Sequence, residues 1–300
     1  MGIGYLKFTN ENIPITEYYS LKELSSFACT VKIVSCSVIN YDVDLGIVLD
    51  LGNGIEGCMH TFNFEDNTGS SKLTIISFIG QKIEAYVDSV ENNIVYLNRA
   101  KLQRDYKVKY LNTLPIGSII DARIASIADF GAFVDLGYGV VGLLPIGDIS
   151  IARFPTISDV LSKGDFIKVV YKGLLKSGYV VTHKELLGTW EENLNDIGIG
   201  SYCLGIVREL KPYGAFIELN PNITGLAEIP NNLHIAEGDS VRVQLRSINP
   251  EKLKVKLAII SKSSIEYKVR YKYRIESGIL TNWEYTPKNS IKSIKTVFKE

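Results

Sequence analysis

Two aromatic pairs, each flanking a Gly-Ala dipeptide, are the residues of this 300-residue sequence best suited to chemistry at a surface. They are Phe130 with Phe133 and Tyr213 with Phe216. Alternating apolar residues predict an extended chain, and a bulge at the glycine would turn both rings of a pair to one side. Exposed rings stack nucleobases, while nearby Lys and Arg meet the phosphates. The competing interpretation is that the four rings are core residues.

A repeat places these pairs in equivalent positions. The offset from Gly117 to Gly200, from Gly131 to Gly214 and from Gly142 to Gly225 is 83 residues in each case. A weaker copy lies upstream, where Gly46 and Gly57 repeat the 11-residue gap between Gly131 and Gly142. Three modules of roughly 80 residues follow from this periodicity.

The elements that must position the aromatic pairs are short strands. Five strand signals in about 70 residues predict a five-stranded barrel of the OB type, which leaves no exposed sheet edge. We therefore expect an all-β chain of three tandem OB-fold barrels. A short N-terminal helix, capped by Ser20 and Glu23, precedes them, and residues 185–194 predict a helical linker. The expected domains are a lead-in over 1–28, modules over 29–105, 114–188 and 197–260, and a tail over 261–300.

The tail has a different pattern from the modules. Tyr267–Arg274 alternates aromatic or apolar with basic residues, which predicts a strand that pairs with Ile279–Tyr285 in a hairpin. After Pro287, apolar residues at helical spacing predict a helix. The hairpin would carry a secondary basic surface of Lys268, Arg270, Lys272 and Arg274.

The formal net charge of zero hides an asymmetry along the chain. Residues 201–300 hold 16 basic and 10 acidic side chains, so a footprint for a polyanion should lie in the last third. Strict alternation in residues 241–246 and 254–257 places one basic set on the outer face of two strands, namely Arg242, Arg246, Lys254 and Lys256. The alternative is that this set is an ordinary solvated face.

Other classes of chemistry lack their residues. The sequence has three histidines that are isolated from one another, and it has no nucleophile elbow and no phosphate-binding loop. We therefore do not expect an enzyme or a cofactor. Cys58 and His60 have no second pair of metal ligands, and the four cysteines show no paired spacing, so we expect reduced thiols and no metal. No signal peptide or long apolar run is visible, and we expect a cytoplasmic protein.

At the aromatic pairs, and in the Gly-Leu that follows each of them, the chain resembles the S1 RNA-binding domain family, the OB-fold module of bacterial ribosomal protein S1. The resemblance covers residues 114–188 and 197–260 well and residues 28–100 poorly. The linker over residues 183–193 is similar to that of three-module S1-like proteins from Gram-positive anaerobes.

The resemblance implies an RNA face made of two aromatics, a histidine, and acidic and basic residues near the last two strands. The histidine position is Pro145 in the second module and Glu228 in the third, whereas the first keeps His60 but has Leu45 and Val48 in place of the aromatics. Together with the outward basic residues, the candidate RNA-binding set is Phe130, Phe133, Arg123, Lys172, Tyr213, Phe216, Arg242, Asn249, Lys254 and Lys256.

These observations predict a protein that binds single-stranded RNA with low sequence specificity, in translation or mRNA handling. The expected partners are RNA and the ribosome or RNA-processing proteins, with no membrane and no small-molecule substrate. The alternative is a protein-interaction scaffold that docks to the ribosome or an RNA-processing complex, with RNA contact incidental. Binding of single-stranded DNA is a third possibility, because these residues would also accept DNA.

Overall fold

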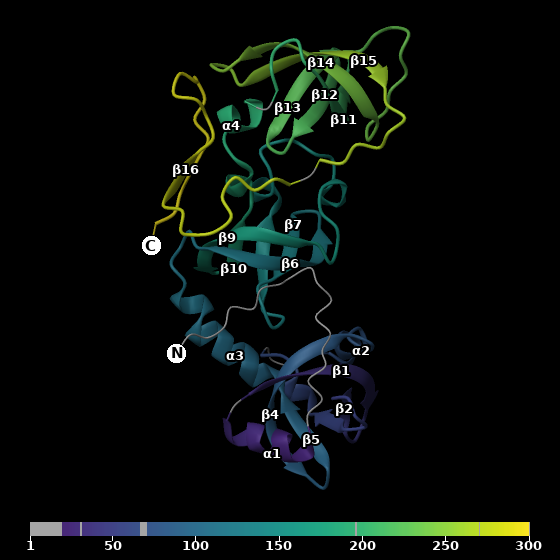
Figure 1. Ribbon diagram of the computed structural model, residues 1–300, viewed down its shortest axis with the longest axis vertical. Helices are drawn as coiled ribbons and strands as arrows, with labels where there is room; N and C mark the ends of the chain where they lie inside the picture. The colour runs from purple at the N-terminus through teal and green to yellow at the C-terminus, as the bar shows by residue number, and fades with distance from the viewer. Residues whose placement is uncertain (1–19, 31, 67–70, 196, 270, 300) are drawn as a thin grey trace. The chain divides into compact units, whose positions relative to one another are not determined.

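The computed structural model describes residues 20–30, 32–66, 71–195, 197–269 and 271–299 (Figure 1). Contacts divide the chain into two compact units, residues 1–113 with 137–140 and residues 114–136 with 141–300. The first unit holds one barrel, and the second holds two barrels and the C-terminal tail. Among the described residues, no helix is long and apolar enough to cross a membrane.

The lead-in helix α1 (Leu21–Thr30) is confirmed together with its cap. The Ser20 backbone N–H donates to the Glu23 carboxylate at 2.7 Å, and the Glu23 N–H donates to the Ser20 hydroxyl at 3.3 Å. This reciprocal capping box satisfies two backbone donors that a helix start would otherwise leave unpaired. Leu24 and Phe27 share one face of the helix and are buried in the core of the first barrel.

Three closed five-stranded barrels confirm the all-β OB architecture. Around each barrel the strands, numbered by their order in the chain, follow one another as first, second, third, fifth and fourth. The third and fifth strands pair in parallel. The first barrel consists of β1 (Ile33–Asp42), β2 (Gly46–Asp50), β3 (Glu56–Met59), β4 (Lys82–Glu91) and β5 (Ile94–Asn98). The second consists of β6 (Ile119–Ala128), β7 (Gly131–Asp135), β8 (Val141–Pro145), β9 (Phe166–Leu175) and β10 (Gly178–Thr182). The third consists of β11 (Tyr202–Lys211), β12 (Gly214–Asn220), β13 (Ile223–Glu228), β14 (Ser240–Asn249) and β15 (Lys254–Lys262).

Short helices connect these strands. In the first unit they are η1 (Thr61–Asn63), α2 (Lys72–Ile76), α3 (Arg99–Lys109) and η2 (Leu111–Thr113). In the second unit they are η3 (Ile146–Asp148), η4 (Ile157–Asp159), η5 (Lys184–Leu187) and α4 (Trp190–Leu194). The linker expected to be helical over residues 185–194 is thus divided, because Gly188 adopts a φ of 86° and Thr189 starts a new helix by accepting the Glu192 N–H.

The stretch around each Gly-Ala pair is a β-hairpin. The sequence-based prediction of a single strand bent at its glycine is therefore wrong. Ala128 pairs with Gly131, so Asp129 and Phe130 form a two-residue turn between β6 and β7. In the third barrel, Pro212 and Tyr213 form the same turn between β11 and β12. The irregularity in register lies upstream of the turn in both hairpins, at residues 124–126 and 207–209.

Gly131 is required for a close approach between strands. A Cβ at this position would lie 2.6 Å from the carbonyl oxygen of Leu144 on the neighbouring strand β8. Gly214 has the same constraint against the carbonyl of Ala227, and its φ of 146° disfavours other residues. The repeated glycine therefore reflects tight strand packing behind the aromatic turn.

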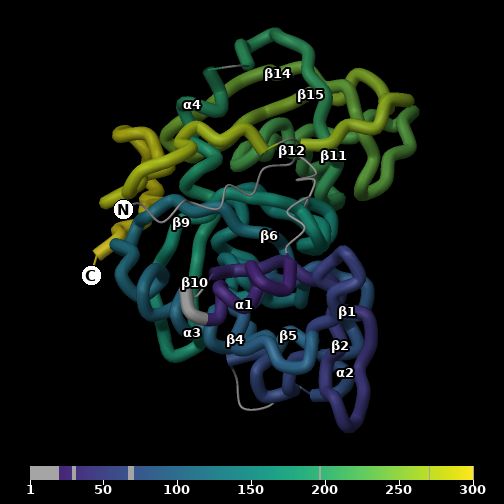
Figure 2. The backbone as a smooth tube through the Cα atoms, turned by 60° about the horizontal axis from the view of Figure 1, so that its bottom comes forward, coloured from purple at the N-terminus to yellow at the C-terminus, as the bar shows by residue number. Residues whose placement is uncertain are grey.

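The tail contains a hairpin, but its strands are not the expected ones. β16 (Asn282–Glu284) pairs with β17 (Lys295–Val297), whereas residues 267–274 form no strand where they are described. The helix expected after Pro287 is wrong, because the described residues 288–299 contain β17 and irregular chain. Figures 1 and 2 show the tail, in yellow, running from the third barrel along the second.

The tail follows the barrels because its backbone and hydroxyl groups bond to them. The Tyr267 hydroxyl donates to the Leu219 carbonyl at 2.9 Å, and the Tyr271 hydroxyl donates to that of Val160 at 3.1 Å. The Tyr273 hydroxyl accepts the Lys168 N–H at 3.0 Å. The aromatic alternation that resembles a strand thus reflects side chains packed onto two barrels.

Asn222 joins the second and third barrels. Its side-chain oxygen accepts the Ile151 N–H at 2.8 Å and the Ser150 hydroxyl at 3.0 Å. Its amide nitrogen donates to the carbonyls of Lys184 at 2.9 Å and Gly188 at 3.2 Å. Asn222 is buried and adopts a φ of 66°, a conformation that asparagine tolerates better than most residues. One side chain therefore satisfies four groups at the joint.

Candidate nucleic-acid interface

The aromatic pairs are exposed at the tips of equivalent hairpins. Phe130 is 58 % exposed and Tyr213 is 62 % exposed, while Phe133 and Phe216 are half-buried on the adjoining strands. The ring centroids of Phe130 and Phe133 lie 5.9 Å apart, and those of Tyr213 and Phe216 lie 6.3 Å apart, with nearly perpendicular planes. Each pair thus presents one open ring supported by a second ring, a geometry that can accept a stacked base.

Strand register places the half-buried ring of each pair in a row of outward residues. In the third barrel the row runs through Glu209, Phe216, Leu226, Lys256 and Ser247. With about 4.8 Å between neighbouring strands, Lys256 lies about 10 Å from Phe216 across the face. An aromatic surface and an exposed cation therefore lie within about two nucleotides of each other.

The second barrel has the same row without the cation. Its members are Ser126, Phe133, Leu143, Val180 and Gly173, so the buried Val180 occupies the position of Lys256. The second barrel accordingly offers rings with less charge than the third.

Asn249 and Lys254 lie opposite each other at the end of the β14–β15 hairpin, and both are exposed. The Asn249 side-chain oxygen accepts the Lys252 N–H at 2.9 Å, which shapes the turn. Lys254 and Lys256 lie on the same strand and project outward with it, so they can meet successive phosphates.

Arg242 lies away from the aromatic row of its barrel, and Arg123 lies three residues, about 10 Å of strand, before Ser126 in the row of the second barrel. Arg242 pairs with Leu204 and Ser261, and five residues, about 17 Å of strand, separate it from the row at Ser247. Its guanidinium lies 5.4 Å from the Tyr202 ring centroid, and that of Arg123 lies 5.7 Å from the Phe166 ring centroid. The structure therefore brings each arginine together with another exposed ring.

Lys172 is held in an ion-pair cluster. Asp148 accepts hydrogen bonds from Lys172 at 2.9 Å and from Lys184 at 2.6 Å. Burial raises the pKa of Asp148, but hydrogen bonds and charge from the two lysines outweigh it and leave the pKa below its ordinary value. The charge of Lys172 is thus partly neutralised within the barrel.

The secondary basic surface is divided by the tail's path. Lys268 and Lys272 are exposed, and Lys268 lies 3.4 Å from the Glu266 carboxylate. Arg274 is half-buried: its backbone N–H donates to Leu186, and its guanidinium donates to the Glu192 carbonyl at 2.9 Å. Arg270 lies outside the described residues.

Sequence reasoning missed a third aromatic cluster, in the first unit. The His60 ring stacks on Phe62, with centroids 5.2 Å apart, and lies 6.4 Å from the Tyr96 ring. Phe62 is 71 % exposed. Tyr96 pairs with Cys58 across parallel strands β5 and β3, so it occupies the row position that Lys256 has in the third barrel. Only this pairing, which the sequence does not display, brings Tyr96 to His60.

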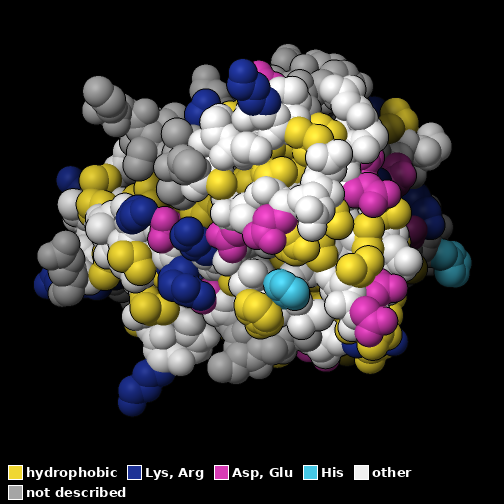
Figure 3. Space-filling model, turned by 90° about the horizontal axis from the view of Figure 1, so that it is seen from below, with side chains coloured by type: hydrophobic (Ala, Val, Ile, Leu, Met, Phe, Trp, Pro, Cys, Tyr) yellow, Lys and Arg dark blue, Asp and Glu magenta, His cyan; other side chains and the backbone are white. Residues whose placement is uncertain are grey.

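One view of the surface (Figure 3) shows side chains of both charges mixed with hydrophobic ones. On the face shown in Figure 3, acidic and basic side chains of the described residues alternate with hydrophobic ones. Lys254 and Lys256 are exposed cations that attract a polyanion locally.

The sequence of this chain is similar to those of several known proteins. A family model described as "S1 RNA binding domain" matches residues 113–176. The small ribosomal subunit protein bS1 of Leuconostoc lactis is 29 % identical over 75 % of this chain and 56 % of its own length. Its homologue in Bacillus subtilis is 27 % identical over 71 % of this chain and 59 % of its own length. The bS1 protein of Staphylococcus aureus is 31 % identical over 61 % of this chain and 51 % of its own length.

The chain spans little more than half the length of these relatives. Among solved structures, a multidomain protein with nucleic acid binding domains from Streptococcus pneumoniae matches 77 % of this chain and 74 % of its own length at 14 % identity, with a TM-score of 0.25. Residues 113–176 therefore match the S1 RNA-binding domain family, and the chain as a whole is similar in sequence to bacterial ribosomal proteins bS1.

Proposed function

We propose that this chain binds single-stranded RNA with low sequence specificity through its second and third barrels, in translation or mRNA handling. The observation that carries the proposal is the pair of equivalent hairpin tips, each with an open aromatic ring supported by a second ring. The S1 domain and the bS1 relatives support RNA binding and a role related to translation. Association with the ribosome is part of the proposal.

In this proposal the aromatic rings bind the bases and the lysines bind the phosphates. Bases stack on Phe130 and Phe133, then on Tyr213 and Phe216, at about 1–3 kcal/mol for each base. In the third barrel Lys254 and Lys256 meet the phosphates. Since every base has an aromatic face, such a track discriminates little between sequences.

A titration with fluorescent oligouridine tests the proposal. The intact chain is compared with a variant in which Phe130, Phe133, Tyr213 and Phe216 are all alanine, and circular dichroism checks that both are folded. The proposal requires binding that weakens with salt and is largely lost in the folded variant. An intact chain that binds no RNA at low salt contradicts it. An oligodeoxyuridine of the same length tests the DNA alternative.

A docking role for the first barrel is the second candidate. At the tip between β1 and β2, where the other barrels carry aromatics, Val43 is 79 % exposed and Leu45 is 57 % exposed. Exposed aliphatic side chains of this kind favour a protein contact over base stacking. Co-sedimentation with ribosomes should weaken in a Val43→Ser, Leu45→Ser variant that keeps its RNA affinity. Unchanged co-sedimentation would remove this candidate.

A further inference from the structure

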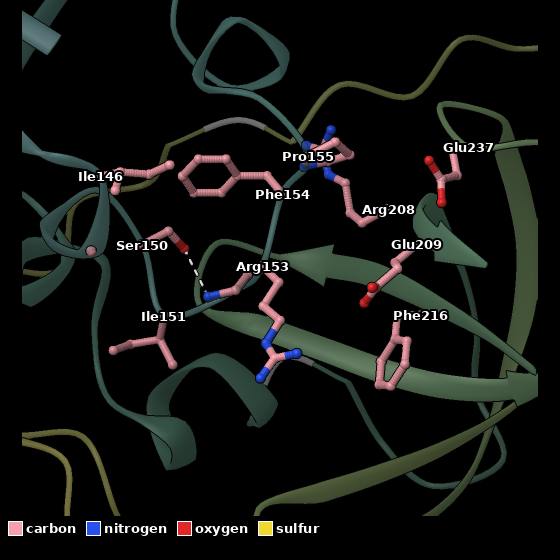
Figure 4. Close-up of a pocket in the computed structure, with 12 residues that line it drawn as sticks. Ile146, Ser150, Ile151, Arg153, Phe154, Pro155, Arg208, Glu209, Phe216 and Glu237 are labelled. Atoms are coloured by element: carbon pink, nitrogen blue, oxygen red, sulfur yellow. Dashed lines mark hydrogen bonds between the residues drawn. The ribbon is translucent and has the colours of Figure 1, made fainter. Parts of the chain in front are cut away.

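A groove of about 460 Å³ lies between the second and third barrels, within one compact unit (Figure 4). Arg153 and Phe154 extend into it from the connection after β8, and Glu209, Phe216 and Glu237 line it from the third barrel. Because Phe216 belongs to the proposed stacking surface, an RNA strand on that surface passes the groove.

The wall of the groove that carries Arg153 is fixed in place. Ser150 and Ile151, just before it, bond to the buried Asn222 side chain of the third barrel at 3.0 and 2.8 Å. The Ala152 N–H donates to the Ser150 hydroxyl at 3.0 Å. A groove that is ordered before its ligand arrives binds at a lower entropic cost.

Glu209 is placed to read the edge of a base stacked on Phe216. The two residues are direct cross-strand partners, so their side chains point outward next to each other. One Glu209 oxygen lies 2.6 Å from the Lys211 ammonium, and an ionised carboxylate has about four acceptor positions in total. Acceptor positions therefore remain for N–H groups of a ligand.

Guanine matches this arrangement best among the four bases. Its Watson–Crick edge offers two adjacent N–H donors, at N1 and N2, which one carboxylate can accept together. Adenine and cytosine offer one amino group each. Uracil offers one N–H between two carbonyl oxygens, which a carboxylate repels.

Arg153 is the exposed cation among the residues that line the groove, because Arg208, which also lines it, is buried and paired with Glu218 at 2.6 Å. Arg153 forms no ion pair within the described ranges, whereas one Glu237 oxygen already accepts the Leu210 N–H at 3.0 Å. A guanidinium that lines the groove together with Glu209 and Glu237 lets a phosphate approach a site that the carboxylates alone would repel it from.

We propose that the groove is a guanine-preferring subsite, in which the base stacks on Phe216, its edge donates to Glu209, and Arg153 meets a flanking phosphate. The inference rests on the proposed function and departs from it at one position of the RNA. The second barrel has Ser126 where the third has Glu209, so it lacks this preference.

Oligouridine 12-mers with and without one central guanosine test the subsite by fluorescence anisotropy. The intact chain should bind the guanosine-containing RNA about tenfold more tightly, as expected for one bidentate base contact. Glu209→Gln should reduce this ratio to below about twofold without weakening binding of the all-uridine RNA. Glu251→Gln, a change at an exposed site outside the groove, should leave the ratio intact.

Equal affinities of the intact chain for the two RNAs would overturn the subsite and leave the proposed function standing. The subsite would also be overturned if Glu209→Gln increased the affinity for both RNAs by the same factor and left the ratio of the two affinities unchanged. Glu209 would then only repel phosphates. Binding of neither RNA would contradict the proposed function itself, and the subsite with it.

Discussion

Phe130 and Tyr213 expose more than half of a large ring at equivalent hairpin tips of two barrels. An open ring at a hairpin tip gives up more than half of the about 1.5–3 kcal/mol that full burial would contribute, so its presence in two equivalent places favours binding over packing. Their partners Phe133 and Phe216 serve both purposes, because they are half-buried and also line the outer face.

A buried histidine gives the chain a measurable response to pH. Burial lowers the pKa of His183 to about 4, partly opposed by its hydrogen bond with the Ile149 carbonyl. The unfolded chain takes up the proton near pH 6.5, so it binds more protons than the folded chain between pH 6.5 and 4. The free energy of unfolding should therefore fall by about 3 kcal/mol as the pH drops through that window.

Urea unfolding at several pH values checks this dependence. His183→Gln removes the titrating group and should flatten the slope between pH 6.5 and 4, even if it lowers stability overall. His234→Gln, at an exposed position, should keep the slope. Equal slopes in the intact chain and His183→Gln would assign the acid response to other groups.

At the scale of elements, the joint at Asn222 and the tail make the second and third barrels one unit. Asn222→Ala removes four hydrogen bonds and places alanine at a φ of 66°, so we expect a loss of about 2–4 kcal/mol. Both tryptophans of the chain, Trp190 and Trp283, are buried in this unit, and their fluorescence during urea unfolding measures the loss.

Asn222→Gly separates backbone strain from lost bonds. Glycine accepts the positive φ, so this variant should recover only the strain, about 1 kcal/mol, and remain destabilised. Full recovery of stability in Asn222→Gly would mean that the four hydrogen bonds contribute nothing to the joint.

The barrels could be predicted from sequence because their signals are local. Alternation of Val241, Val243 and Leu245 with polar residues follows from one buried face, and the repeated Gly131 and Gly214 follow from tight packing on the next strand. The tail could not be predicted, because its tyrosines alternate as a strand would while their partners lie on distant barrels.

The candidate site was predictable only in part for the same reason. The Gly-Ala motif with its flanking aromatics locates Phe130 and Tyr213. The alternation of apolar and polar residues predicts that Lys254 and Lys256 are exposed, as the structure shows. The ion pairs that engage Lys172 and the groove that joins Arg153 to Phe216 depend on segments far apart in the chain. Pairings of this kind leave no local pattern to read.

For the whole molecule, a net charge of zero limits how much electrostatics can contribute to RNA affinity. Each phosphate neutralised on a single strand changes the slope of log affinity against log salt by about 0.7. Lys254→Gln with Lys256→Gln should therefore reduce the slope by about 1.4. Lys288→Gln with Lys292→Gln, two exposed tail positions, should leave it unchanged. An unaltered slope in the first variant would remove both lysines from the RNA track.

The central claim is that two exposed rings bind RNA bases, and a Phe130→Ala, Tyr213→Ala variant tests it most directly. Both changes lie in turns, so circular dichroism and thermal stability should match those of the intact chain. Anisotropy with oligouridine should show a loss of affinity of at least about 30-fold, the sum of two stacking contacts. Ile199→Ala, at another exposed apolar position, should lose none. A folded double variant that binds RNA as tightly as the intact chain would contradict the account.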